Sequence, residues 1–256
     1  MTVETVYTIG VDLSQANDWT AISVLETQLW FSADMLQSVS WRGVTPGWNS
    51  PAGLHLDALE QVLMKDESPW PGKPPLHLRH LERWRGRPYP DIVTTVAEMV
   101  AREPFATCGY ALVVDATGVG APVVDLFRNA GVQVVAVTIH GGDAVKRVRG
   151  GFRVPKRELV ASVQAVMQTG RLGISEGLDQ WPTLKAELQN FKVTIDPKTA
   201  HDSYSHWREG QHDDLVLSLA MATWFRDYYW KSWDRERVQG RAEYARQQLT
   251  AARGGW

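Results

Sequence analysis

Aspartates at the ends of buried apolar segments constrain this chain more than any other feature. Two of them follow short apolar runs that are typical of core strands, and two more open a long apolar run near the C-terminus. A carboxylate in such a place is expensive to bury without a partner. Because one divalent cation can serve several acids, we expect the chain to fold them around a shared metal site. The acids concerned are Asp12, Asp115, Asp213 and Asp214.

The composition is that of a globular chain with enough apolar residues for one sizeable core. Of the 256 residues, 44% are hydrophobic and 22% are charged, and the formal net charge is -2. A chain that is basic overall is thereby excluded, so any surface that binds nucleic acid must be local. The single Cys108 offers neither an internal disulfide nor a cysteine metal cluster, which fits a reducing compartment.

Export and membrane signals are not visible in the sequence. The first residues do not lead from a basic segment into an apolar one, as a signal peptide does. No apolar run approaches the roughly 18 residues that a membrane span needs. We therefore expect an intracellular, cytoplasmic protein that has no membrane partner.

The N-terminal part has the pattern of a strand meander with one long insertion. The strands that we expect, from their apolar and β-branched composition, are residues 6–13, 19–26, 28–33 and 76–84. The first two are joined by a few polar residues, which predicts a hairpin. Residues 34–73 are rich in Gly, Pro, Ser and Trp, which predicts an irregular insertion with one short helix over residues 54–64.

The rest of the chain alternates between strands and helices and then ends in helices. The strands that we expect are residues 110–114, 132–138 and 191–195, and the helices are residues 91–102, 118–129, 156–168, 181–190, 211–230 and 234–253. This order predicts an α/β fold with a mixed central β-sheet flanked by helices on both faces. We expect one domain over residues 1–230, which includes the insertion, and a helical tail over residues 231–256.

The chemistry of several converging carboxylates favours phosphodiester cleavage. Two divalent ions roughly 3.5–4 Å apart activate a water and hold the charge that builds on the phosphate. Mg²⁺ and Mn²⁺ prefer oxygen ligands, so such a site needs several carboxylates from distant segments. We expect Asp12, in the middle of the sheet, to contact both ions. Asp115 reaches one side from the neighbouring strand, and Asp213 or Asp214 arrives from a helix across the sheet.

Each acid also has an ordinary structural role when it is considered alone. Asp115 has the position of a turn or cap residue. Asp213 and Asp214 fit a helix N-terminus, where an acid caps the helix and interacts favourably with its dipole. Asp18, at the start of the second strand, is either a further acid near the metals or a hairpin residue. The occurrence of Asp12, Asp115 and the Asp213/Asp214 pair together, in this order, favours the metal site.

Five short motifs resemble, in this order, those of one known family. They are Gly10-Val11-Asp12, Asp18-Trp19-Thr20-Ala21, Val114-Asp115-Ala116-Thr117-Gly118-Val119-Gly120, Pro155-Lys156-Arg157-Glu158-Leu159-Val160, and Gly210-Gln211-His212-Asp213-Asp214-Leu215-Val216. Together they resemble the nuclease domain of phage terminase large subunits, which has the ribonuclease H-like fold shared with RuvC-type resolvases. The resemblance runs from about Tyr7 to Trp230.

The resemblance implies an endonuclease that cuts concatemeric double-stranded DNA during viral genome packaging. On that pattern two Mg²⁺ or Mn²⁺ ions are the cofactors, and Asp12, Asp115 and the Asp213/Asp214 pair are the metal ligands. If the chain is encoded by a bacteriophage, it works in the cytoplasm of the bacterial host. Double-stranded DNA is then the main partner.

The chain departs from the family in one respect. Terminase large subunits usually carry an ATPase motor ahead of the nuclease, yet this sequence contains no Gly-x-x-x-x-Gly-Lys-Ser/Thr motif. The chain is therefore either an excised domain or a stand-alone nuclease whose motor is a separate polypeptide. In the second case we expect a packaging ATPase, a small terminase subunit or a portal as a further partner.

A local basic stretch and two other residues complete the candidate site. The basic residues are Lys146, Arg147, Arg149, Arg153 and Arg157. We expect them to grip DNA phosphates beside the cut, although a solvated loop leading into an exposed helix start explains them as well. Lys156 either neutralises a carboxylate or a phosphate, or is a surface lysine. His212 either assists at the metal site or is a polar loop residue.

Three other functions fit parts of the sequence. A RuvC-like structure-specific resolvase shares the predicted fold but cuts branched DNA, normally as a symmetric dimer. An actin-like ATPase opens with a similar phosphate-binding hairpin, but that hairpin needs glycines soon after Asp12, where Ser14, Gln15 and Ala16 stand. A non-catalytic packaging or docking subunit is the third, and the retention of every acid argues against it.

Overall fold

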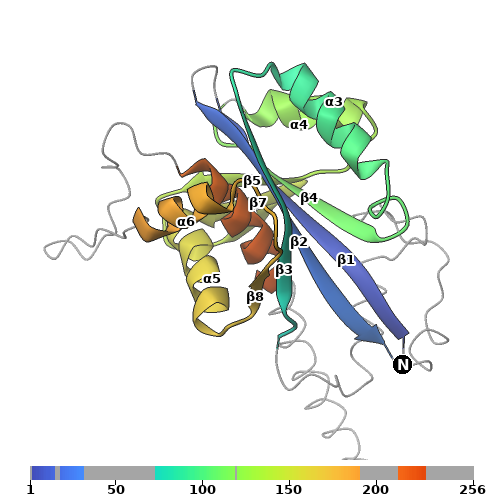
Figure 1. Cartoon of the computed structure of the whole chain (residues 1–256). Helices are drawn as coiled ribbons and strands as arrows, with labels where there is room; N and C mark the ends of the chain where they lie inside the picture. Colours follow the sequence, from blue (N-terminus) through green and yellow to red (C-terminus); the bar gives the residue numbers. More distant parts are fainter. Residues whose placement is uncertain (1, 15–17, 32–72, 119, 191–212, 229–256) are drawn as a thin grey trace, which may run out of the picture.

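The framework of the protein is one sheet of eight strands in the order β6-β7-β5-β4-β1-β2-β3-β8 (Figure 1). The computed structural model describes residues 2–14, 18–31, 73–118, 120–190 and 213–228. The strands are β1 (Thr2–Asp12), β2 (Trp19–Phe31), β3 (Leu76–Arg85), β4 (Gly109–Asp115), β5 (Val135–His140), β6 (Lys146–Val148), β7 (Gly151–Pro155) and β8 (Leu172–Ile174). The helices are α3 (Tyr89–Val100), α4 (Gly120–Asn129), α5 (Lys156–Gln168) and α6 (Trp181–Asn190), followed by a helix at residues 214–228.

β1 joins the two halves of the sheet. On one side β2 runs antiparallel to it, with Asp12 opposite Ala21. On the other side β4 runs parallel to it, with Val11 beside Val114. Because β4 and β1 point the same way, Asp12 and Asp115 end their strands next to each other at the same edge of the sheet.

Helices cover both faces of this sheet, and each face has its own core. α3 and α4 pack on one face, against side chains of β1 such as Ile9 and Val11. α5, α6 and helix 214–228 pack on the other, with Leu159, Leu184 and Leu219 buried among them. Figure 1 shows these two groups of helices on opposite sides of the strands. The predicted α/β fold, with a mixed central sheet flanked by helices on both faces, is confirmed.

Helix 214–228 packs directly on the backbone of β1 because Gly10 has no side chain. A Cβ added to Gly10 would lie 1.9 Å from the carbonyl oxygen of Ser218 and 3.2 Å from the Cβ of Ala222. The hydroxyl groups of Ser23 on β2 and Ser218 are 2.5 Å apart and fix the helix along the sheet. The helix therefore begins near the carboxyl end of β1.

The outer strands of the sheet differ from the prediction. The basic stretch after β5 forms β6 and β7, a hairpin that turns at Gly150 (φ 78°), rather than a loop. Its pattern in the sequence is short, because β6 has three residues and β7 has five, of which Phe152 and Val154 belong to the hydrophobic core. β8 was not expected either, and β5 begins at Val135 instead of residue 132.

Several predicted segments lie outside the described residues. They are the insertion up to residue 72 with its helix at 54–64, the strand at 191–195, the helix at 234–253 and the tail at 231–256. Among the helices that are described, none is long and apolar enough to cross a membrane.

We expect Gly10→Ala to destabilise the fold by about 3 kcal/mol, at the upper end of the typical range for overpacking a core. The new methyl group would overlap a helix carbonyl that belongs to the backbone and cannot rotate away. Urea denaturation measures the loss. Gly141→Ala is the matched control, because nothing lies within 4 Å of a Cβ at that position. Equal stability of the two variants would contradict the close packing described here.

Candidate functional site

The first part of the site is the pair of carboxyl groups at the ends of β1 and β4. Asp12 is buried, with 6% of its surface exposed, and its side chain lies within hydrogen-bonding reach of Asp115. Asp115 accepts hydrogen bonds from the backbone N–H of Thr117, at 2.8 Å, and from the Thr117 hydroxyl. The same hydroxyl accepts a bond from the N–H of Ile139 on β5, at 2.8 Å. Asp115 is thus held in place by the neighbouring strand.

The second part is the acidic start of helix 214–228. Asp213 precedes the helix, and its carbonyl oxygen accepts the first helical hydrogen bond, from Leu217, at 2.8 Å. Its carboxylate pairs with the Nζ of Lys156, at 2.9 Å, where α5 begins. Asp214 is buried, with 4% of its surface exposed. Lys156 thus pairs with a carboxylate in this structure, and its part at a metal site stays a prediction.

The electrostatics join these two parts into one acidic cluster. Burial raises the pKa of Asp12 well above its ordinary value, and the charges of Asp115, Asp214 and Asp213 raise it further. The charge of Lys156 opposes this shift. Burial also raises the pKa of Asp115, against the hydrogen bonds from Thr117 that lower it. The structure therefore brings together all four acids that the sequence singled out.

Glu187 on α6 is an acid at this site that the sequence analysis missed. It is 8% exposed, and its Oε2 accepts a hydrogen bond from the backbone N–H of Val216, at 3.1 Å. Burial raises its pKa to about 7, and the charges of Asp214 and Asp213 contribute to that rise. In the sequence it is one glutamate of an amphipathic helix, and no local motif distinguishes it.

The donor set of the cluster suits a hard divalent cation. All four aspartates offer carboxylate oxygens, which are the ligands that Mg²⁺ and Mn²⁺ prefer. Within the described part of the chain, no group of three or more His, Cys, Asp or Glu side chains is arranged so that it could hold a metal ion. Asp12 lies against Asp115, and Asp213 is paired with Lys156. The chemistry of the donor set fits the ion.

The sequence also predicted two possible accessory residues, Asp18 and His212. Asp18 is exposed at the start of β2, and its Oδ1 accepts a hydrogen bond from the N–H of Trp19, at 3.0 Å. This local bond matches the hairpin role. His212 lies outside the described residues, and its place at the metal site stays a prediction.

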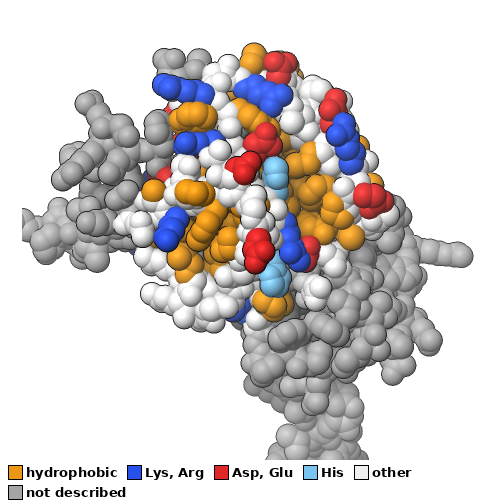
Figure 2. Space-filling view, in the orientation of Figure 1, with side chains coloured by type: hydrophobic (Ala, Val, Ile, Leu, Met, Phe, Trp, Pro, Cys, Tyr) orange, Lys and Arg blue, Asp and Glu red, His pale blue; other side chains and the backbone are white. Residues whose placement is uncertain are grey.

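The basic residues lie along the hairpin that leads into the cluster. Lys146, Arg147, Arg149 and Arg153 are exposed on or beside β6 and β7. β7 ends at Pro155, and Lys156 follows directly as the first residue of α5. Arg157 differs, because its guanidinium is held by Asp143, at 2.6 Å. On the face of the molecule seen in Figure 2, acidic and basic side chains alternate with hydrophobic ones instead of forming one charged patch.

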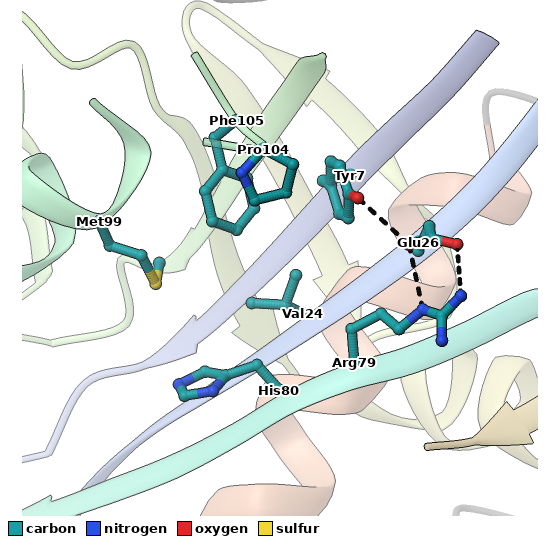
Figure 3. Close-up of a pocket in the computed structure, with 8 residues that line it drawn as sticks. All are labelled: Tyr7, Val24, Glu26, Arg79, His80, Met99, Pro104 and Phe105. Atoms are coloured by element: carbon teal, nitrogen blue, oxygen red, sulfur yellow. Dashed lines mark hydrogen bonds and ion pairs between the residues drawn. The ribbon is translucent and has the colours of Figure 1, made fainter. Parts of the chain in front are cut away.

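A pocket of about 400 Å³ lies on the opposite face of the sheet, away from the acids (Figure 3). A bulge in β3, where Val24 pairs with His80 and Leu25 with Leu78, leaves Arg79 as an extra residue. Arg79 binds the carboxylate of Glu26 with Nη2 and Nε, at 2.8 and 3.0 Å, and Tyr7 donates to it at 3.1 Å. The carboxylate in this pocket is fully paired, so it is a structural acid.

The comparisons with known proteins find a similarity in structure. No protein-family model matches the chain, and no curated protein matches its sequence. Among solved structures, the chain is similar to the large terminase nuclease from the thermophilic phage G20c. The match covers 85% of this chain and 81% of that chain, at 18% sequence identity and a TM-score of 0.47. At this level of similarity, the roles of individual side chains rest on their own contacts.

We expect Asp12→Asn to stabilise the metal-free protein by about 1 kcal/mol, as relief of a strained functional site commonly does. The amide keeps the size of the side chain but cannot ionise, so no charge can form at this buried position among other carboxyl groups. Urea denaturation in the presence of a chelator measures the effect. Asp125→Asn is the control, because Asp125 is exposed on α4 and should change stability by less than about 0.5 kcal/mol. A marked destabilisation by Asp12→Asn would show that its charge is well paired.

Proposed function

We propose that this protein is a metal-dependent endonuclease that cleaves double-stranded DNA, as the nuclease of a viral genome-packaging machine. The observation that carries the proposal is the arrangement of four carboxyl groups from β1, β4 and the start of helix 214–228, in which Asp115, Asp213 and Asp214 act electrostatically on the buried Asp12. Two other buried acids have cationic partners, since Glu26 pairs with Arg79 and Asp227 pairs with Lys73 and Arg171. The charges that act on Asp12 come from three carboxyl groups and, in opposition, from Lys156, and a bound cation would balance such a cluster.

We assign Asp12, Asp115, Asp213 and Asp214 as the residues that hold two Mg²⁺ or Mn²⁺ ions. Bound there, the ions would supply an activated water and neutralise the charge that builds on the phosphate. The protein contributes orientation, because Thr117 fixes Asp115 and the packing on Gly10 fixes the start of the helix. Lys156 keeps Asp213 close to the cluster and adds a positive charge beside the position that we assign to the phosphate.

We assign the contacts to DNA to the hairpin of β6 and β7. Its lysine and arginine side chains are exposed and lead directly to Lys156, so a DNA phosphate backbone held by the hairpin would run past the four aspartates. Contacts of this kind reach phosphates and read no sequence, which suits a nuclease that cuts with little base preference. A separate packaging ATPase, a small terminase subunit or a portal would deliver the DNA.

The nuclease assignment predicts metal-dependent nicking of supercoiled plasmid. The native protein should nick with Mn²⁺ or Mg²⁺, and a chelator should stop the reaction. Asp12→Ala and Asp115→Ala should each lower the rate by about 100-fold or more, since losing even an outer-shell partner of a metal costs about 10–100-fold. Gel electrophoresis over time measures both rates. Asp125→Ala, an exposed acid on α4, should nick as the native protein does. Equal nicking by all variants, or none with any divalent ion, would reject the assignment.

The hairpin assignment predicts a change in the salt dependence of DNA binding. Replacing Lys146, Arg147 and Arg149 by alanine should lower the slope of log affinity against log salt by about 0.9 for each phosphate contact that is lost. Fluorescence anisotropy with a labelled duplex, in an Asp12→Ala background, measures the slope. Arg102→Ala, an exposed arginine at the end of α3, should leave it unchanged. An unaltered slope in the triple variant would place the DNA elsewhere on the protein.

A further inference from the structure

At the start of helix 214–228, the functions of a helix cap are divided between two acids, Asp213 and Glu187. Asp213 occupies the N-cap position, since its carbonyl oxygen accepts the N–H of Leu217. An aspartate there normally turns its carboxylate back to accept the N–H of the second or third helical residue. Here the third residue is Val216, and its N–H donates to Glu187 on α6, at 3.1 Å. The carboxylate of Asp213 turns the other way, toward Lys156.

The Val216 N–H needs an acceptor, whichever acid supplies it. The first N–H groups of a helix have no partner within the helix, and Val216 is fully buried, so water does not satisfy its N–H. Glu187 supplies a carboxylate oxygen from outside the helix, close to the positive end of the helix dipole. As long as Glu187 holds this bond, the cap position does not need the side chain of Asp213.

Glu187 is itself fixed to the first hairpin of the fold. Its Oε1 lies 3.8 Å from Nη1 of Arg83 on β3. The guanidinium of Arg83 in turn lies 4.2 Å above the centre of the Trp19 ring, at the start of β2. β2 pairs with the strand that ends in Asp12. A chain of contacts therefore runs from the hairpin that carries one acid to the helix that carries the others.

We propose that Glu187 is a positioning residue, which caps helix 214–228 in place of Asp213 and so leaves the Asp213 carboxylate available to the metal centre. The role of the Asp213 carboxylate at a metal rests on the proposed function. The capping by Glu187 rests on geometry alone. Without Glu187, the Asp213 side chain turns back to satisfy Val216 and leaves the cluster. The residue acts through the helix and touches neither ion nor DNA.

Metal affinity separates this role from a merely structural one. Glu187→Ala should weaken Mn²⁺ binding to the folded protein by about 10-fold or more, as the loss of an outer-shell partner does. Glu187→Gln should stay within about threefold of the native protein, because its amide oxygen can accept the same N–H. Isothermal titration with Mn²⁺ in the absence of DNA measures both. Glu26→Gln, a buried acid on the other face of the sheet, is the matched control and should leave Mn²⁺ binding unchanged.

A melting experiment tests the cap independently of metal. In the native background, Asp213→Ala should change the melting temperature little, because that side chain does not cap the helix. In the Glu187→Ala background, Asp213 has become the cap, and the same change should lower the melting temperature by about 2–4 °C more. The four proteins, measured with a chelator present, form a double-mutant cycle.

The outcomes distinguish the two proposals. Additive melting shifts, or a Glu187→Ala variant that melts lower but binds Mn²⁺ as tightly as the native protein, would overturn the positioning role. A native protein that binds no divalent ion would reject the proposed function, and the melting cycle would still decide whether Glu187 replaces Asp213 as the cap.

Discussion

The contact between helix 214–228 and the backbone of β1 is the constraint on which the site depends. A helix that approaches this closely requires a glycine in the strand, and Gly10 is placed two residues before Asp12. The serine pair, Ser23 and Ser218, then sets the position of the helix along the sheet. With that position fixed, the first residues of the helix can only lie above the ends of β1 and β4. A side chain at residue 10 would raise the helix and separate the acids, even with every acid still present.

The same helix is anchored at its far end by an ionic contact that makes the crowded acids tolerable. Asp227 is buried, and it pairs with Lys73 at 2.5 Å and with Arg171 at 3.1 Å. Arg171 also donates to the carbonyl oxygen of Pro74, so this end of the helix is joined to the segment that leads into β3. Breaking a buried pair of this kind typically costs 3–5 kcal/mol, which exceeds the relief expected from removing one charge of the cluster. The helix therefore stays in place although its start carries unfavourable charges.

The sequence predicted much of the order of the described elements and pointed to Asp12, Asp115, Asp213 and Asp214, because both are local signals. The role of these acids at a metal stays a prediction. Asp12 and Asp115 each follow an apolar strand, and Asp213 and Asp214 precede an apolar helix, so their surroundings can be read from neighbouring residues. Glu187 could not be found in this way, since its importance comes from Val216, which is 29 residues away in sequence. The hairpin of β6 and β7 was missed for a related reason. Its strands are short, and its stability comes from pairing with β5, which is a tertiary effect.

Buried acids in this protein fall into two classes, and the difference bears on function. Glu26 accepts hydrogen bonds from Arg79 and Tyr7, and the bond from Arg79 is the main reason that its pKa is lowered. Asp227 is likewise surrounded by cations. Asp12 has the opposite surroundings, since burial and three neighbouring carboxyl groups raise its pKa. A fold selected for stability alone would treat Asp12 as it treats Glu26, with an arginine. Asp12 instead lies among carboxyl groups, with the charge of Lys156 opposing the rise of its pKa, and our proposal of a bound cation rests on this contrast with Glu26.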